Sequence, residues 1–161
     1  MRKIAVLPAL NPEENLKQQY LILGLPSYDG IPGLLKLVGL EDTGKKKVKN
    51  FSMGMKQRLG IAIALAGDPD LLVLDEPVNG LDPVGMKEMR ILFRRLVQEE
   101  GMTILMSSHL LSEIEQIADR VGVIVDGTIM REAEMTDIWK QHSSDMEDYF
   151  ISLIQGGADH A

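Results

Sequence analysis

The stretch Leu71-Leu72-Val73-Leu74-Asp75-Glu76-Pro77 decides the fold of this 161-residue chain. Four consecutive apolar residues that end at two acids and a proline are typical of a parallel strand whose two faces are both covered. A helix is expected next, because Asp82 is a favoured N-cap residue and Pro83 suits the first helical position. A second apolar strand is expected from Met102 to Met106. This alternation of strand and helix predicts an α/β core with a parallel sheet.

The segments on the C-terminal side continue the alternation. The helix that begins after Asp82 is expected to reach Glu100, with Gly101 ending it in the left-handed conformation. The other expected elements are a helix at about 110–119 capped by Ser107-Ser108, a hairpin of strands 121–125 and 128–130 with a tight turn at Asp126-Gly127, and a peripheral helical tail from Glu132 onward.

The segments on the N-terminal side of the core favour helices. Residues 13–23 are expected to form one helix, which Gly24 stops, and residues 31–40 a second. Leu59 to Ala66 is apolar on nearly every side, which predicts a buried helix. The sequence therefore predicts an α-helical portion before the α/β core.

Composition excludes several classes of protein. The net charge is −7, which disfavours a protein that binds nucleic acid, because phosphate contacts require a basic surface. The chain has no cysteine, so neither a disulfide framework nor a thiolate metal site can form. No apolar run approaches the roughly 20 residues that span a bilayer. We expect a soluble chain whose membrane role, if it has one, comes through a partner.

Two acids follow the first strand. In an open α/β sheet, ligands bind beyond the carboxyl ends of the strands. There Asp75 could hold Mg²⁺, usually through water, and Glu76 could orient an attacking water in phosphoryl chemistry. The alternative is an acidic loop that is simply exposed to solvent.

Three neighbouring features favour a site over a solvated loop. Ser52 and Gly54 begin a helix, where unpaired N–H groups would face an anion. Asp82 lies in the turn that joins the acidic strand to the next helix. His109 follows the second strand and so belongs to the same edge of the sheet. Together with the acids, these residues indicate a phosphate-binding site.

Four segments resemble motifs of the ATP-binding-cassette (ABC) ATPase family. They are Ser52 to Arg58 (the signature motif), the strand ending in Asp75-Glu76 (Walker B), Asn79 to Asp82 (the D-loop) and Ser107-Ser108-His109 (the H-loop). The residues in these motifs are similar to those of bacterial export ATPases of the bacitracin-resistance and multidrug type. The resemblance implies the C-terminal part of a P-loop NTPase core with a parallel sheet, preceded by an α-helical subdomain.

The resemblance also divides the chain into four parts. Residues 1–12 would follow the family's Q-loop, 13–68 would be the helical subdomain with the signature motif, 69–131 the Walker B, D-loop and H-loop part of the core, and 132–161 a C-terminal helical tail.

The family's roles carry over residue by residue. Asp75 would serve Mg²⁺, Glu76 would be the catalytic base, and His109 would contact the γ-phosphate and hold the attacking water. Asp82 would act across a dimer interface.

The signature residues imply a second subunit. Ser52 and Gly54 would touch the γ-phosphate of an ATP that is held by the opposite subunit of a head-to-tail dimer, and Met53 and Met55 belong to the same cofactor-binding motif. Met53 stands where the common motif has Gly, and Met55 where it has Gln, as in the export-type variant.

One family motif has no credible match. A Walker A loop, Gly-x-x-x-x-Gly-Lys-Ser/Thr, cradles the phosphates with its N–H groups and places a hydroxyl on Mg²⁺. The nearest segment, Gly39 to Lys46, has a lysine in place of the hydroxyl and Glu41-Asp42 inside the cradle, and it follows a predicted helix. We expect that the chain begins after the Q-loop, and that on its own it binds ATP weakly and hydrolyses it negligibly.

The resemblance implies part of the ATP-binding and hydrolysing subunit of a bacterial exporter of a drug, peptide antibiotic or similar substrate. Its partners would be transmembrane permease subunits, which would dock on residues 13–50, and its place the cytoplasmic face of the cell membrane. The alternative is a catalytically inactive, degenerate interaction or dimerisation module. A DNA-repair ATPase head is disfavoured, because no coiled-coil heptads are present.

Overall fold

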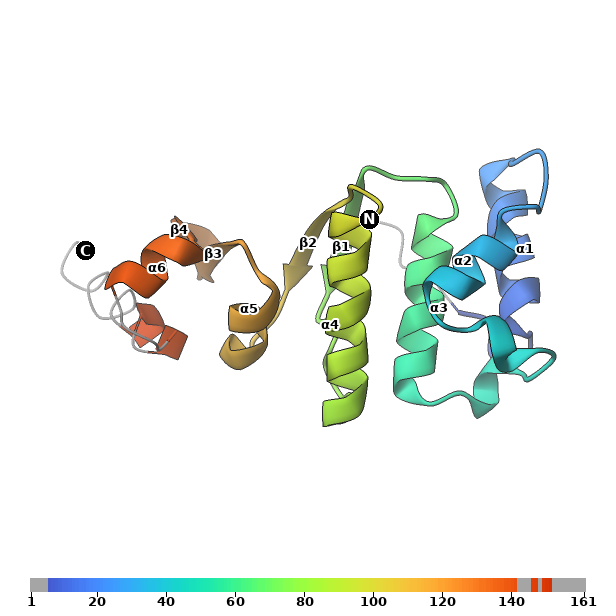
Figure 1. The fold of residues 1–161 in the computed structure, drawn as a ribbon, viewed down its shortest axis with the longest axis horizontal. Helices are drawn as coiled ribbons and strands as arrows, with labels where there is room; N and C mark the ends of the chain where they lie inside the picture. Colours follow the sequence, from blue (N-terminus) through green and yellow to red (C-terminus); the bar gives the residue numbers. More distant parts are fainter. Residues whose placement is uncertain (1–5, 142–145, 148, 152–161) are drawn as a thin grey trace. The chain divides into compact units, whose positions relative to one another are not determined.

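The chain forms two compact units, Met1–Ser107 and Ser108–Ala161, in a computed structural model that describes residues 6–141, 146–147 and 149–151 (Figure 1). The first contains α1 (Pro12–Leu23), α2 (Ile31–Leu37), two short 3-10 turns η1 (Glu41–Thr43) and η2 (Val48–Asn50), α3 (Met53–Leu65), β1 (Leu71–Asp75), α4 (Pro83–Gln98) and β2 (Thr103–Ser107). The second contains α5 (Leu111–Ile117), β3 (Arg120–Val125), β4 (Thr128–Glu134) and α6 (Met135–Gln141).

Helices α1, α2 and α3 contact one another, as the prediction of an N-terminal helical portion requires. Each helix contributes a side chain to the shared core: Leu16 and Leu59 are fully buried, and Ile31 nearly so. Helix α3 begins at Met53, as expected for a helix that starts at Ser52 and Gly54 and continues into the apolar run. The hydroxyl of Ser52 caps it by accepting a hydrogen bond from the N–H of Met55.

Helix α2 ends at Leu37, three residues earlier than predicted. Gly39 adopts a left-handed φ of 65°, and the N–H of Leu40 then donates to the carbonyl of Leu35 at 2.8 Å. This is a Schellman ending, in which glycine reverses the chain and an apolar residue folds back. Leu40 is buried as a result.

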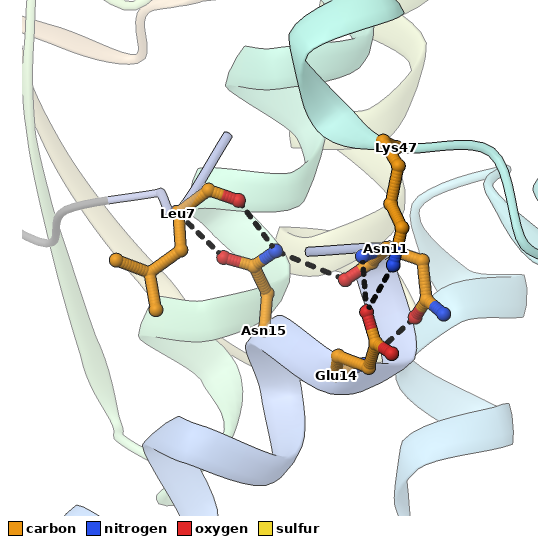
Figure 2. Close-up of polar contacts among 5 residues, drawn as sticks. All are labelled: Leu7, Asn11, Glu14, Asn15 and Lys47. Atoms are coloured by element: carbon orange, nitrogen blue, oxygen red, sulfur yellow. Dashed lines mark hydrogen bonds and ion pairs between the residues drawn. The ribbon is translucent and has the colours of Figure 1, made fainter. Parts of the chain in front are cut away.

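A polar network fixes the start of α1 (Figure 2). Asn11 and Glu14 form a capping box, in which each side chain accepts the other's backbone N–H at 2.9 and 2.7 Å respectively. The buried Asn15 accepts from the N–H of Leu7 at 2.7 Å and donates to the carbonyls of Leu7 and Asn11. These bonds tie the segment before α1, which had no predicted structure, to the helical core. Of the segment at residues 1–12 that was predicted to follow the Q-loop, residues 1–5 lie outside the described residues.

The charge of Glu14 is part of this network. The N–H of Asn11 and the ammonium of Lys47, whose Nζ lies 3.0 Å from Glu14 Oε2, both favour the carboxylate. They hold the pKa of Glu14 below its usual range.

Glu14→Gln is expected to reduce the loss of thermal stability in acid. Because the pKa of Glu14 is lower in the folded chain than in the unfolded chain, its stabilisation is complete above its ordinary pKa of about 4.3 and is lost as the pH falls through the folded pKa. Melting midpoints followed by circular dichroism from about pH 6 to about pH 3 should fall less in the variant than in the wild type. Glu13→Gln removes a charge from the same turn and leaves the capping box intact, so it is the control. Identical acid slopes for Glu14→Gln and wild type would contradict this assignment.

Strands β1 and β2 lie side by side and parallel, as predicted. Their register runs from Leu71 opposite Thr103 to Asp75 opposite Ser107. Helix α4 joins the two strands and runs beside them (Figure 1). Its start confirms the predicted cap, because Asp82 Oδ1 accepts the N–H of Gly85 at 2.8 Å. Helix α4 ends at Gln98, two residues before the predicted Glu100, and Gly101 is left-handed as expected.

The prediction that both faces of the first strand are covered is wrong. Successive strand residues point to opposite faces. Leu72 is buried, whereas Leu71 and Val73 are 51% and 42% exposed, and Leu105 on β2 is 60% exposed. The described residues therefore cover one face of the β1–β2 sheet with helix and leave the other face apolar and open to solvent.

The second unit is built around an antiparallel hairpin of β3 and β4. Asp126 and Gly127 both have positive φ, which makes the predicted tight turn a two-residue type I′ turn. The core of the unit gathers apolar side chains from the hairpin and from the segments after it: Val123, Met135, Ile138, Met146 and Tyr149.

Strand β4 continues to Glu134, so the prediction of a helical tail from Glu132 is wrong at its start, and the expected boundary between residues 131 and 132 falls inside the strand. The physical reason is pairing with β3, which places Glu134 opposite Arg120. The guanidinium of Arg120 lies 3.6 Å from the carboxylate of Glu132 and 2.9 Å from that of Glu134. Helix α6 begins at Met135. Residues 142–145, 148 and 152–161 of the predicted tail lie outside the described residues. Within the described part of the chain, no helix has both the length and the apolar character that a bilayer span requires.

Candidate functional site

The two acids stand at the carboxyl end of β1, and one hydroxyl from β2 contacts both residues. Ser107 Oγ donates to Asp75 Oδ1 at 2.7 Å and accepts the backbone N–H of Glu76 at 2.9 Å. The parallel register explains the contact, since Asp75 and Ser107 are opposite each other as the last residues of their strands. The carboxyl edge of the sheet therefore carries a joined Asp-Glu-Ser cluster.

The backbone at Glu76 is strained. Its φ of 48° lies in the left-handed region, which costs a residue with a Cβ about 1–2 kcal/mol. A following proline, here Pro77, also favours extended backbone in the residue before it. Such conformations persist only when the surroundings hold them, and they concentrate at functional sites. Glu76 is held by the contact of its N–H with Ser107 and by a turn in which the N–H of Asn79 donates to its carbonyl at 3.1 Å.

Two helix starts face a common cavity in the first unit. The cavity has a volume of about 360 Å³. The start of α3 and the turn into α4 both line it, and four of the predicted site residues are among its lining: Ser52, Met53, Gly54 and Asp82. The first N–H groups of a helix have no acceptor within the helix. Both helix starts line one space, which Arg58, Asp82 and Glu88 also line. The first turns of helices are common places for anions to bind.

Two side chains of α3 connect this helix start to the turn and to α4. Gln57 Nε2 donates to the carbonyl of Asn79 at 3.3 Å, and Arg58 Nη2 lies 3.4 Å from Glu88 Oε2. The Arg58 side chain is only 21% exposed, so this ion pair is better shielded from water than a surface pair. These contacts fix the position of α3 against the segment that follows the acids.

The remaining predicted site residues are placed as follows. Met55 lies in the first turn of α3, and its N–H is taken by the cap at Ser52. His109 follows β2 and belongs to the second unit, whereas the acids belong to the first. The structure thus brings together Ser52, Met53, Gly54 and Asp82 at one cavity, and Asp75 with Glu76 at the strand end. The catalytic and binding roles of all eight residues stay predictions.

The carboxylates at the strand end suit Mg²⁺ that is bound together with water and a nucleotide. Among the described residues, no group of three or more His, Asp or Glu side chains could hold an ion. Asp75 is exposed, which leaves room for water around its carboxylate. Mg²⁺ is commonly held by one or two carboxylates together with waters and nucleotide phosphates. The residues present therefore fit Mg²⁺ that arrives with a nucleotide and do not form a complete cage of their own.

Sequence reasoning missed the role of Ser107. The pair Ser107-Ser108 was predicted to cap the following helix, but the N-cap of α5 is Leu110, and only Ser108 supports that turn, by accepting the N–H of Leu110 at 3.1 Å. The sequence did contain a signal that could have predicted this contact. Asp75 and Ser107 both end apolar runs that were predicted to be neighbouring parallel strands, and the ends of such strands meet.

Comparison with known proteins identifies relatives that match most of this chain. A family model described as "ABC transporter" matches residues 2–79. The chain is 53% identical over 138 residues to the uncharacterized ABC transporter ATP-binding protein YcbN of Bacillus subtilis and 48% identical over 138 residues to the bacitracin transport ATP-binding protein BcrA of Bacillus licheniformis. Each match covers 86% of this chain and 45% of the relative. It is also 50% identical over 145 residues to the lantibiotic transport ATP-binding protein SrtF of Streptococcus pyogenes, which covers 90% of this chain and 60% of the relative. The chain thus spans about half the length of the curated relatives it matches.

Two solved structures share the fold. One is a structure of an ATP-binding subunit of an ABC transporter, with a TM-score of 0.73 and 26% identity over 96% of this chain and 66% of that chain. The other is a dimeric structure of a post-hydrolysis state of the ATP-binding cassette MJ0796 bound to ADP and Pi, with a TM-score of 0.69 and 25% identity over 84% of this chain and 61% of that chain. The architecture is therefore that of a P-loop NTPase of the ABC type, as predicted.

Proposed function

The chain belongs to the family of ABC transporter ATP-binding proteins, and from this premise we propose that it is the part of an exporter's ATP-hydrolysing subunit that carries the acid pair. The observation that carries the proposal is the cluster at the end of β1, where Asp75 and Glu76 are held by Ser107. The names of BcrA and SrtF support peptide antibiotics as the class of exported substrate.

The residues at the strand end suit two different tasks. The carboxylate of Asp75 is exposed and would hold Mg²⁺ through water, and the ion would supply neutralisation of charge on the terminal phosphates of ATP. Glu76 would accept a proton from the attacking water and orient it. His109, which follows β2, would hold that water's geometry against the γ-phosphate.

The cavity at the two helix starts suits the other side of a dimer. Its donors at Ser52 and Gly54 would bind the γ-phosphate of an ATP held by a second subunit, and Asp82 would act across the same interface. A head-to-tail pair is therefore part of the proposal, and the dimeric relative in the solved structures supports it. Permease subunits would complete the exporter, with this chain on the cytoplasmic face of the membrane.

The 161 residues alone are expected to hydrolyse ATP negligibly. No Walker A sequence is present among them, so nothing replaces the backbone cradle and lysine that bind the phosphates. Phosphate release should stay at the rate of a protein-free blank, and the melting midpoint should not move when ATP and Mg²⁺ are added, since only a ligand that binds the folded chain raises it. Mg²⁺-dependent turnover that Glu76→Gln abolishes would overturn this expectation.

The absence of a Walker A sequence from these residues also favours a second candidate, an inactive module that dimerises or binds a partner. A chimera that supplies a relative's phosphate-binding loop separates the two. Hydrolysis by the chimera supports the first function, and a correctly folded chimera without hydrolysis supports the second.

A further inference from the structure

We propose that Ser107 is a positioning residue, whose hydroxyl sets the side-chain orientation of Asp75 and the backbone conformation of Glu76 at the same time. The importance of these two acids rests on the proposed function, but the contacts do not. The hydroxyl has one proton and two lone pairs. The proton is given to Asp75 Oδ1 at 2.7 Å, and a lone pair accepts the Glu76 N–H at 2.9 Å.

Both acids need such a constraint. The side chain of Asp75 is exposed, so neighbouring side chains do not pack it into one rotamer. Glu76 has a φ of 48°, a conformation that glutamate adopts rarely. Consecutive strand residues would point to opposite faces, so the left-handed turn at Glu76 decides where the second acid points. A fixed donor and acceptor on β2 supplies both constraints.

The two bonds also strengthen each other. A hydroxyl that donates to a carboxylate becomes a better acceptor, because hydrogen bonds in a chain polarise one another. The bond to the carboxylate is charge-assisted and shorter than the bond from the backbone, as expected. Removing the hydroxyl therefore removes both constraints in one step, whereas threonine keeps the hydroxyl and is well suited to a strand.

The test is solution NMR of the 161-residue chain, without nucleotide, in wild type, Ser107→Ala and Ser107→Thr. In Ser107→Ala the exchange rate of the Glu76 amide should rise about fivefold or more relative to the amides of Leu72 and Val73. The Hα–Hβ couplings of Asp75 should change from those of a single rotamer to averaged values. Ser107→Thr should restore both. Ser108→Ala is the matched control, since the neighbouring hydroxyl contacts Leu110 instead and its loss should leave both signals unchanged.

Three outcomes would overturn the proposal: unchanged Glu76 exchange and Asp75 couplings in Ser107→Ala, equal acceleration of all β1 amides, or failure of threonine to restore the wild-type signals. Because Ser107 is exposed at a strand end, its truncation leaves the core intact, and the variant is expected to fold. The measurement needs no ATP. A negative result here therefore leaves hydrolysis by the chimera unaffected, and an inactive chimera leaves these contacts unaffected.

Discussion

Glu76→Gln is expected to lower ATP turnover by about 100- to 10,000-fold in a chimera that joins this chain to the part of Bacillus licheniformis BcrA preceding its match. Glutamine keeps the size of the side chain but cannot accept the proton of the attacking water. The loss should appear in kcat, with a KM for ATP close to that of the parent chimera, because the phosphate-binding loop is unchanged. Steady-state phosphate release measures both constants.

Glu100→Gln is the matched control for this experiment. Glu100 is exposed beyond the end of α4, away from the strand end that carries the acids, and the same chemical change there should leave kcat unaltered. A Glu76→Gln chimera that keeps most of its turnover would contradict the role of Glu76 as base. The parent chimera must hydrolyse ATP for the comparison, and its failure to do so while folded would favour the inactive module.

Leu59→Ala is expected to lower the free energy of unfolding of the first unit by about 2–5 kcal/mol. Leu59 is fully buried in α3, the helix that contacts α1, α2 and α4, so alanine would leave a cavity at the point where the helices meet. Urea titration followed by NMR signals of α3 measures the change. Fluorescence of Trp139 is unsuitable, because this residue lies in the second unit.

Ile91→Ala is the control for the packing experiment. This side chain is 58% exposed on α4, so its truncation should change the same free energy by no more than about 0.5 kcal/mol. A loss below about 1 kcal/mol in Leu59→Ala would show that the surrounding helices collapse into the space. It would then contradict Leu59 as the centre of the helical core.

The elements that local chemistry determines could be predicted from the sequence. Asp82 followed by proline caps α4 as expected, and Asp126-Gly127 forms a type I′ turn because both residues tolerate positive φ. The two apolar runs pair as parallel strands. For the cap and the turn, a few neighbouring residues contain the whole physical cause.

Features that depend on distant partners could not be predicted in the same way. The segment from Glu132 to Glu134 was predicted to be helical, but it continues strand β4, paired with β3 and with Arg120 opposite its two glutamates. The apolar run at Leu71 indicates that both faces of the strand would gain from burial. It does not show which segments cover each face. The contact of Ser107 with the acids required the register of β1 against β2.

The candidate site also combines features that local sequence predicts with features that depend on packing. Ser52 and Asp82 could be recognised as helix starts, but their common cavity depends on how α3 packs beside α4. The acids could be placed at the end of a strand, but the left-handed backbone of Glu76 could not, because glutamate before proline favours an extended conformation. Pattern identifies the chemical groups, and packing determines their geometry.

The open face of the β1–β2 sheet makes the yield of soluble protein a matter of competing rates. Folding is a first-order process. Association of two molecules through the exposed Leu71, Val73 and Leu105 is second-order, so its rate rises with the square of the protein concentration. Dilute preparations should therefore stay clear, and overproduction at high expression levels should direct the same polypeptide into inclusion bodies.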